Sequence, residues 1–156
     1  MAEIDRKGAQ VKFPPPLIFV SFMALAYWMG SFYPITFSSP EWLKFIAAFL
    51  MVMGFAILLH ILFIFKRQQT AIEPWQPTSV IISHGYYRYS RNPIYLIFCL
   101  YPIGLGCMLG SLWLIVSLVP ACIAVYLIAI KAEERYLHQK FPQEYGEYCL
   151  RVRRWL

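Results

Sequence analysis

A dense polar and aromatic segment, "HGYYRYSRNPIYL" (84–96), lies directly before an apolar run of the sequence. Asn92 followed by Pro93 is typical of a helix start, with an N-cap residue and a proline at the first helical position. The free N–H groups of such a start favour an anion, and Arg88 and Arg91 can add forked donors to a carboxylate. The tyrosines offer flat faces for a ring or a cation. An aromatic belt with basic residues at a membrane surface is the simpler interpretation of the same residues.

A second candidate feature is the pair of adjacent carboxylates Glu133 and Glu134, just after the last apolar run. They could bind the hydroxyls of a ribose or an ammonium group; the alternative is a solvated helix turn with local ion pairs to Lys131 and Arg135. The connection 109–111 is so short that the last two apolar runs must form a hairpin. Both features then lie on one side of a membrane, with Arg91 and Glu134 at opposite ends of one pocket. Such a pocket suits a zwitterionic ligand that carries an aromatic ring.

The elements that must position these residues are four apolar runs: 17–37, 42–65, 94–109 and 111–130. A membrane span needs roughly 20 residues at 1.5 Å rise per residue. The third run is short and needs Pro93 and the preceding tyrosines to complete it. The sequence therefore predicts an all-α integral membrane protein, a single domain over 1–156, with four transmembrane helices at about 17–37, 42–65, 93–109 and 111–130. Cytoplasmic helices are expected at the C-terminal end.

The composition supports a membrane protein and an orientation. Of the 156 residues, 60% are hydrophobic and 14% charged, which is too apolar for a soluble domain of this size. The net charge of +6 comes from basic residues that flank apolar runs, so lipid headgroups are the expected partner and nucleic acid is not. Lys44 is the exception among Lys and Arg residues that otherwise lie before residue 13, within 66–91 and after 130. Both termini and the segment 66–92 are therefore expected to face the cytoplasm.

The tail 131–156 is expected to continue the fourth span as a polar helix to about Lys140 and to break at Pro142. A short amphipathic helix should follow, with Tyr145, Tyr148, Val152 and Trp155 on one face. The four cysteines show no paired spacing that predicts a disulfide or a metal site.

Together, "GYYRYSRNPIYL" and, about forty residues later, "EERYLHQKFPQEYGEYCLRVRRWL" resemble the isoprenylcysteine carboxyl methyltransferase and phospholipid methyltransferase group of integral membrane enzymes. The family pattern is Gly-x-Tyr-Arg-x-x-Arg-(His/Asn)-Pro-x-Tyr, then Glu-Glu-x-x-Leu, then Phe-Gly-x-x-Tyr-x-x-Tyr and a basic end. The resemblance covers about residues 66–156, and its upstream part is similar to bacterial members, which implies a bacterial inner membrane. Asn92 replaces the commoner histidine, and Pro142 stands where glycine is frequent.

This resemblance implies S-adenosylmethionine as cofactor, with cytoplasmic cofactor segments at 66–92 and 131–156 and no metal. The residues that it assigns to cofactor binding are His84, Gly85, Tyr86, Tyr87, Arg88, Arg91, Asn92, Pro93, Tyr95, Leu96, Glu133, Glu134 and Leu137. The residues that it assigns to catalysis are Arg88, Glu134, Tyr148 and Arg151.

The resemblance leaves the methyl acceptor open. A lipophilic acceptor is expected, reaching the site from the bilayer: a prenylated cysteine carboxylate as the first choice, otherwise an aminophospholipid or a small thiol. A base is needed only if the acceptor arrives protonated, and His84, His138, the glutamates and Tyr148 are the candidates. His60 is interpreted as a packed residue. The rival enzyme is an NADPH-dependent membrane reductase, and the rival without an activity is a structural membrane protein, which leaves the segment 84–96 unexplained.

Overall fold

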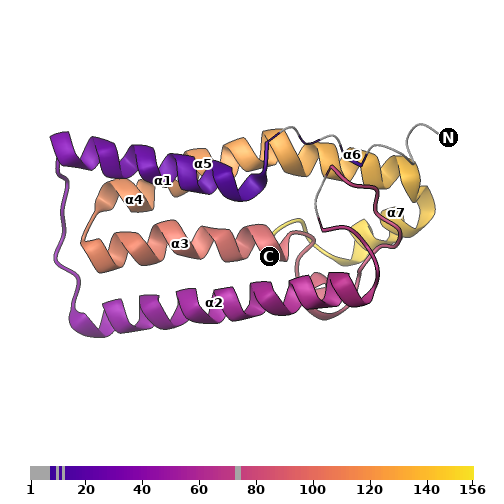
Figure 1. The fold of residues 1–156 in the computed structure, drawn as a ribbon, viewed down its shortest axis with the longest axis horizontal. Coiled ribbons are helices and arrows are strands. Elements are labelled where there is room, and N and C mark those ends of the chain that lie inside the picture. Colours follow the sequence, from indigo (N-terminus) through magenta and orange to yellow (C-terminus); the bar gives the residue numbers. More distant parts are fainter. Residues whose placement is uncertain (1–7, 10, 12, 73–74) are drawn as a thin grey trace. The chain divides into compact units, whose positions relative to one another are not determined.

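The computed structural model describes residues 8–9, 11, 13–72 and 75–156 (Figure 1). Arg6, Lys7 and Lys12, on which part of the orientation prediction rests, lie outside the described residues. The regular elements of the described residues are helical, which confirms the all-α class. In chain order they are α1 (Pro15–Phe32), α2 (Glu41–Arg67), η2 (Gly85–Arg88), α3 (Pro93–Leu109), α4 (Leu112–Val116), α5 (Leu118–Val125), η3 (Tyr126–Ile130), α6 (Lys131–Lys140) and α7 (Pro142–Arg151).

Three helices in the described part of the chain are long and apolar enough to cross a membrane. They are α1, α2 and the continuous helix Leu112–Lys140, which joins α4, α5, η3 and α6. The helix α3 is apolar but has 17 residues, so its crossing stays a prediction. The first span ends at Phe32 rather than at Phe37, because Pro34 cannot continue a helix and restricts the residue before it.

The chain forms two compact units, each assembled from separate segments of sequence. We call the first the apolar unit; it comprises Pro14–Leu58 and Tyr95–Val125. We call the second the polar unit; it comprises the described residues of Leu59–Ile94, of Tyr126–Leu156 and of the N-terminal part up to Phe13. The helix α2 contributes its last turns to the polar unit, and α3 begins in the polar unit at Pro93.

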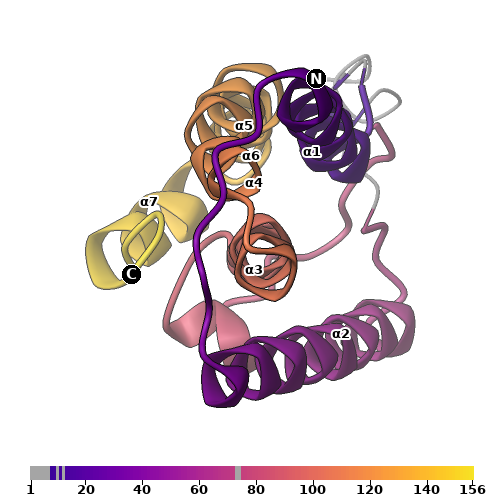
Figure 2. The same ribbon diagram turned by 90° about the vertical axis from the view of Figure 1, so that its left-hand side faces the viewer.

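In the apolar unit, α1 packs lengthwise against α4 and α5, and both views show α1 beside α5 (Figures 1 and 2). Phe19 of α1 and Ala121 and Val125 of α5 are almost completely buried. The glycines of α2 and α3 permit a close approach: a Cβ at Gly54 would lie 3.0 Å from Leu100 Cδ1. Small residues at such interfaces let helices pack closely. Close packing matters in lipid, because the hydrophobic effect does not drive helix association there.

The connection from α3 to α4 is as tight as its sequence predicts. Gly110 takes φ +62°, a left-handed conformation that glycine adopts without a Cβ penalty. Its carbonyl accepts a hydrogen bond from Phe37 N at 2.9 Å, and Leu112 N donates to Ile35 O at 3.0 Å. The loop after α1 is therefore fastened to this turn by backbone hydrogen bonds.

In the polar unit, α6 ends at Lys140, and Pro142 begins α7, as predicted. The helix α7 stops at Arg151, so the prediction that Val152 and Trp155 belong to it is wrong: Val152 is extended, with φ −127° and ψ 131°. Val152 still packs in the core of this unit, because an extended chain can place alternate side chains on one face. That core consists of Ile81, Tyr145, Tyr148 and Val152, with Tyr87, Leu137, Phe141 and Cys149 packed against it.

Candidate functional site

An ionic cluster on α6 joins the two segments that carry the sequence motifs. Arg154 donates from Nε to Glu134 Oε1 at 2.8 Å and from Nη2 to Oε2 at 2.9 Å, which is the forked geometry of a strong charge-assisted pair. Arg91 Nη1 lies 3.4 Å from Glu134 Oε1. Side-chain exposure is 13% for Arg91 and 17% for Glu134, so water screens this pair weakly. Arg91 and Glu134 therefore meet directly rather than at opposite ends of one pocket.

The C-terminal residues are fastened to the segment before α3 by three hydrogen bonds. Arg91 N donates to Arg153 O at 3.0 Å. Both Ser90 Oγ and Asn92 Nδ2 donate to Arg154 O, at 3.3 and 3.0 Å. Ser90 and Asn92 are buried, so these bonds satisfy polar groups that would otherwise be costly to bury. They also hold Arg154 beside Glu134.

Arg91 occupies the junction of the two motif segments. Besides Glu134, its Nη1 atom donates to Cys149 Sγ at 2.7 Å. Its Nε atom is buried and has no hydrogen-bond partner among the described residues. Burial raises the pKa of Tyr145, as do Cys149 and Glu134, while Arg91 lowers it. One donor of the guanidinium is therefore available inside a largely enclosed, ionic environment.

Three tyrosines, Tyr87, Tyr145 and Tyr148, pack together beside this junction. Tyr148 donates its hydroxyl to Tyr87 O at 2.6 Å, and the rings of Tyr145 and Tyr148 lie 6.1 Å apart. Burial raises the pKa of Tyr148, against a lowering by Arg91, and burial together with the charge of Glu133 raises the pKa of Tyr87. Tyr148 therefore keeps its proton as a donor, which disfavours the prediction that it is a base.

The remaining predicted residues are spread more widely. His84, Arg88 and Arg151 are exposed, and Arg151 Nε donates to Glu147 O within α7. Gly85 takes φ +62° where a Cβ would meet nothing within 4 Å, and Pro93 opens α3 as predicted. Leu137 packs on the tyrosine core. Tyr95 and Leu96 belong to the apolar unit, and their assignment to the cofactor stays a prediction.

Several residues of this cluster were not singled out by sequence reasoning. Arg154 is the main partner of Glu134, and its guanidinium lies 5.2 Å from the ring centre of Tyr126; its hydrogen bonds to Glu134 raise its pKa. Ser90 and Cys149 also belong to the cluster. The sequence signal was the basic end "RVRR", but it did not distinguish Arg154 from its exposed neighbours.

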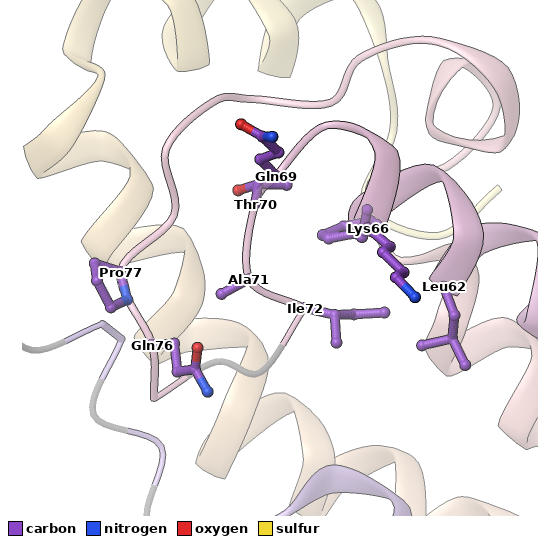
Figure 3. Close-up of a pocket in the computed structure, with 9 residues that line it drawn as sticks. Leu62, Lys66, Gln69, Thr70, Ala71, Ile72, Gln76 and Pro77 are labelled. Carbon is purple, nitrogen blue, oxygen red and sulfur yellow. The ribbon is translucent and has the colours of Figure 1, made fainter.

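A separate groove of about 460 Å³ lies around the end of α2 (Figure 3). It is lined by Leu62, Phe65, Lys66, Gln69, Thr70, Ala71, Ile72, Gln76 and Pro77. In Figure 3 the side chain of Lys66 extends past Ile72 toward Leu62. None of the residues that the resemblance assigns to cofactor binding or catalysis is among these lining residues. The ring of Phe65 lies 5.8 Å from that of Tyr87 and so connects the groove to the tyrosine core.

Helices of membrane length together with an ionic and aromatic cluster place this protein in the class of helical membrane proteins with a polar site. The family model of phospholipid methyltransferases matches residues 42–144. No curated protein and no solved structure matches the chain. Because the match covers more than half of the 156 residues, the chain belongs to the phospholipid methyltransferase family.

Proposed function

We propose that this protein transfers a methyl group from S-adenosylmethionine to a lipophilic acceptor at the cytoplasmic face of a membrane. The observation that carries the proposal is the cluster of Arg91, Glu134 and Arg154, which joins two motif segments far apart in the sequence. Membership of the phospholipid methyltransferase family supports the methyl transfer. The distribution of Lys and Arg residues supports an orientation in which both termini and the segment 66–92 are cytoplasmic.

The described residues fit the polar groups of this cofactor. The buried, unpartnered Nε atom of Arg91 is a donor for the methionine carboxylate. Glu134 is an acceptor for the ammonium group or for ribose hydroxyls, and it would have to share with Arg154 or release it, because both its oxygens are occupied. Tyr87, Tyr145 and Tyr148 supply aromatic faces beside these groups.

When bound, the cofactor supplies a methyl carbon already activated by the neighbouring sulfonium. The work left to the protein is mainly orientation, with the acceptor, methyl and sulfur held in line at about 3–3.5 Å between reacting atoms. Arg91 would hold the methionine carboxylate, and Glu134, which contacts Arg91, would hold the ammonium group or the ribose hydroxyls. The low exposure of both side chains strengthens these contacts by excluding water. The family favours a phospholipid as acceptor over a prenylated cysteine carboxylate or a small thiol.

A binding measurement on the purified protein in detergent, with S-adenosylhomocysteine and NADPH side by side, tests the cofactor. S-adenosylhomocysteine should bind and raise the midpoint of thermal unfolding, by an amount that grows with ligand excess over the dissociation constant. NADPH should give no such response. Tight binding of NADPH with no response to S-adenosylhomocysteine would instead establish the membrane reductase.

Substitutions in the ionic cluster test its role. Arg91→Ala and Glu134→Ala should each weaken binding of S-adenosylhomocysteine by about 2–5 kcal/mol, or roughly 30-fold and more, because each removes a charge-assisted contact in a partly buried site. Affinity is measured by titration calorimetry. Arg91→Lys and Glu134→Gln, which preserve much of the packing, should weaken binding in the same direction if the alanine variants fail to fold.

The controls are Arg135→Ala and Arg153→Ala, which remove exposed positive charges from the segment 131–156 that also carries Glu134. Both should bind S-adenosylhomocysteine as the wild type does. If the segment 84–96 only anchors the protein to lipid, all arginine variants will behave alike. Wild-type affinity in folded Arg91 and Glu134 variants would remove the cluster from the cofactor site.

A further inference from the structure

The ring of Tyr126 lies beside the ionic cluster of the polar unit. The guanidinium carbon of Arg154 is 5.2 Å from the centre of this ring, and Lys131 Nζ is 5.6 Å from it. Both cations are within the distance of about 6 Å at which the negative face of an aromatic ring attracts positive charge. Arg154 is also forked onto Glu134, which contacts Arg91. Direct contacts therefore place Tyr126 next to the residues that are proposed to hold the cofactor.

An irregular turn of the long helix explains why Tyr126 and Lys131 meet. In an α-helix, residues five positions apart point about 140° away from each other, so the two side chains would not share a face. Residues Tyr126–Ile130 form the π-helical turn η3, whose i→i+5 hydrogen-bond spacing brings them closer together. Such turns are rare and are frequent at functional sites. Because nothing in the residue order announces this turn, sequence reasoning did not single out Tyr126.

Other tyrosine rings of the polar unit have aromatic partners. The ring of Tyr86 meets that of His60 edge to face, with centres 5.6 Å apart, and Tyr145 meets His138 in the same way at 4.7 Å. The side chain of His60 is exposed, so the sequence interpretation of His60 as a packed residue is wrong. Tyr126 differs from Tyr86 and Tyr145, because a charged group of the ionic cluster lies over its ring.

Tyr126 lies where the long helix changes from apolar to polar residues. Its neighbours Leu127 and Ile128 expose apolar side chains, whereas Lys131 exposes a charged one. Exposed apolar side chains on a helix of membrane length fit a lipid environment, so the Tyr126 ring lies at the end of the lipid-facing surface of this helix. A lipophilic acceptor that comes from the bilayer would meet the transferred methyl group near that level.

We propose that Tyr126 holds the sulfonium of S-adenosylmethionine by a cation–π contact, and that this contact distinguishes the cofactor from its neutral product, S-adenosylhomocysteine. This proposal rests on the proposed function. The sulfur is four bonds from the ammonium nitrogen, or about 5 Å at single-bond lengths, so an ammonium group on Glu134 leaves the sulfur within reach of the neighbouring ring. The sulfonium would take the ring face that Arg154 covers, as Glu134 exchanges Arg154 for the ammonium group.

Methyl transfer removes the charge that the ring would recognise. The acceptor forms a bond to the methyl carbon, the bond between that carbon and sulfur breaks, and its electron pair stays on sulfur, which becomes a neutral thioether. The cation–π attraction depends on a positive charge over the ring, so it is lost with the methyl group. At this contact the product is held less tightly than the cofactor, which favours exchange of one for the other.

The test compares the affinities of the two ligands, measured by titration calorimetry on the full chain in detergent free of acceptor lipid. Tyr126→Leu should weaken binding of S-adenosylmethionine by about 5- to 30-fold, as expected for a cation–π contact at a half-buried ring. Its affinity for S-adenosylhomocysteine should be unchanged. Tyr126→Phe keeps the ring and should bind both ligands as the wild type does. Tyr89→Leu, which removes an exposed ring at the end of η2, should also bind both normally.

A graded substitution separates the charge of the ring face from its shape. Phenylalanines of increasing fluorination, introduced at position 126, keep the shape of the ring while weakening its negative face. Affinity for S-adenosylmethionine should fall stepwise along this series, and affinity for S-adenosylhomocysteine should stay constant. The series tests the contact even if Tyr126→Leu does not fold.

The outcomes separate this proposal from the proposed function. If Tyr126→Leu weakens both ligands equally or neither of them, or if fluorination leaves affinity for S-adenosylmethionine unchanged, the ring only packs against Arg154 and its assignment to the sulfonium is wrong. The proposed function then stands as long as the wild type binds S-adenosylhomocysteine. Failure of the wild type to bind either ligand overturns the proposed function itself.

Discussion

Different interactions stabilise the interior of the apolar unit and the interior of the polar unit, although one chain forms both. In the apolar unit the helices pack through small and apolar side chains, and large apolar residues such as Phe45 and Val52 of α2 remain 72% and 69% exposed. In the polar unit, hydrogen bonds join residues more than fifty positions apart, such as Arg91 to Arg153 and to Cys149, and ion pairs join Glu134 to Arg91 and Arg154. Exposed apolar side chains on a helix of membrane length, such as those of α2, fit a lipid environment.

This difference indicates where the chain tolerates change. Lipid solvates an apolar helix surface whatever its side chains are, so the outer face of α2 can exchange one large apolar residue for another. The ionic cluster cannot be exchanged in that way, because removing one partner leaves a largely buried charge without compensation. Within the apolar unit, positions where two backbone segments touch do not tolerate such changes, because the contact leaves no room for a side chain.

Gly110→Ala is expected to give the largest effect on stability. The residue has φ +62°, and a Cβ would lie 2.5 Å from the backbone oxygen of Phe37, which cannot rotate away. Left-handed strain together with this overlap should lower the free energy of unfolding by about 3 kcal/mol. Denaturant titration in detergent, followed by circular dichroism, measures the change.

Gly146→Ala is the matched control for that substitution in the polar unit. Gly146 lies within α7, and a Cβ there would meet nothing within 4 Å. Alanine should therefore raise stability by about 0.5–1 kcal/mol, the usual helical preference over glycine. A similar loss of stability in both variants would show that backbone crossings do not distinguish the two units.

Alkaline pH should destabilise the polar unit through its buried tyrosines, with a smaller effect per tyrosine and pH unit than that of Gly110→Ala. Burial, as the main cause, raises the pKa of Tyr87, Tyr145 and Tyr148, so these phenols ionise more easily when the chain unfolds. Their contribution is fully present below the ordinary tyrosine pKa of about 10 and is lost as the pH rises above it. The loss is about 1.4 kcal/mol per group for each pH unit, until the folded-state pKa is reached.

Hydrogen exchange at increasing pH, corrected for its intrinsic rate, measures where this loss occurs. Protection in α7 should fall above about pH 10 while α1 and α5 retain theirs. Phenol absorbance should show a group of tyrosines that resists ionisation until the unit opens. Equal loss of protection in both units would contradict the assignment of the buried phenols to the polar unit's stability.

Local sequence signals predicted which helices form, though not the ends of α1 and α7, because helix formation depends on neighbouring residues. The apolar runs predicted α1, α2 and the first part of the long helix Leu112–Lys140, whose polar end was predicted from the tail, and Pro93 and Pro142 marked where α3 and α7 begin. The family pattern in the second half of the chain predicted the phospholipid methyltransferase family. Each of these signals can be recognised in the order of residues along the chain, without knowing which elements pack against each other.

Partners across the chain were decided only by the tertiary structure. Which arginine of the basic tail meets Glu134 depends on where α7 ends and on the hydrogen bonds from Ser90 and Asn92 to Arg154 O. The contact of His60 with Tyr86 likewise depends on the path of the loop between α2 and η2. Sequence alone therefore determined the helices, the family and the candidate segments, and the fold determined which of their side chains contact one another.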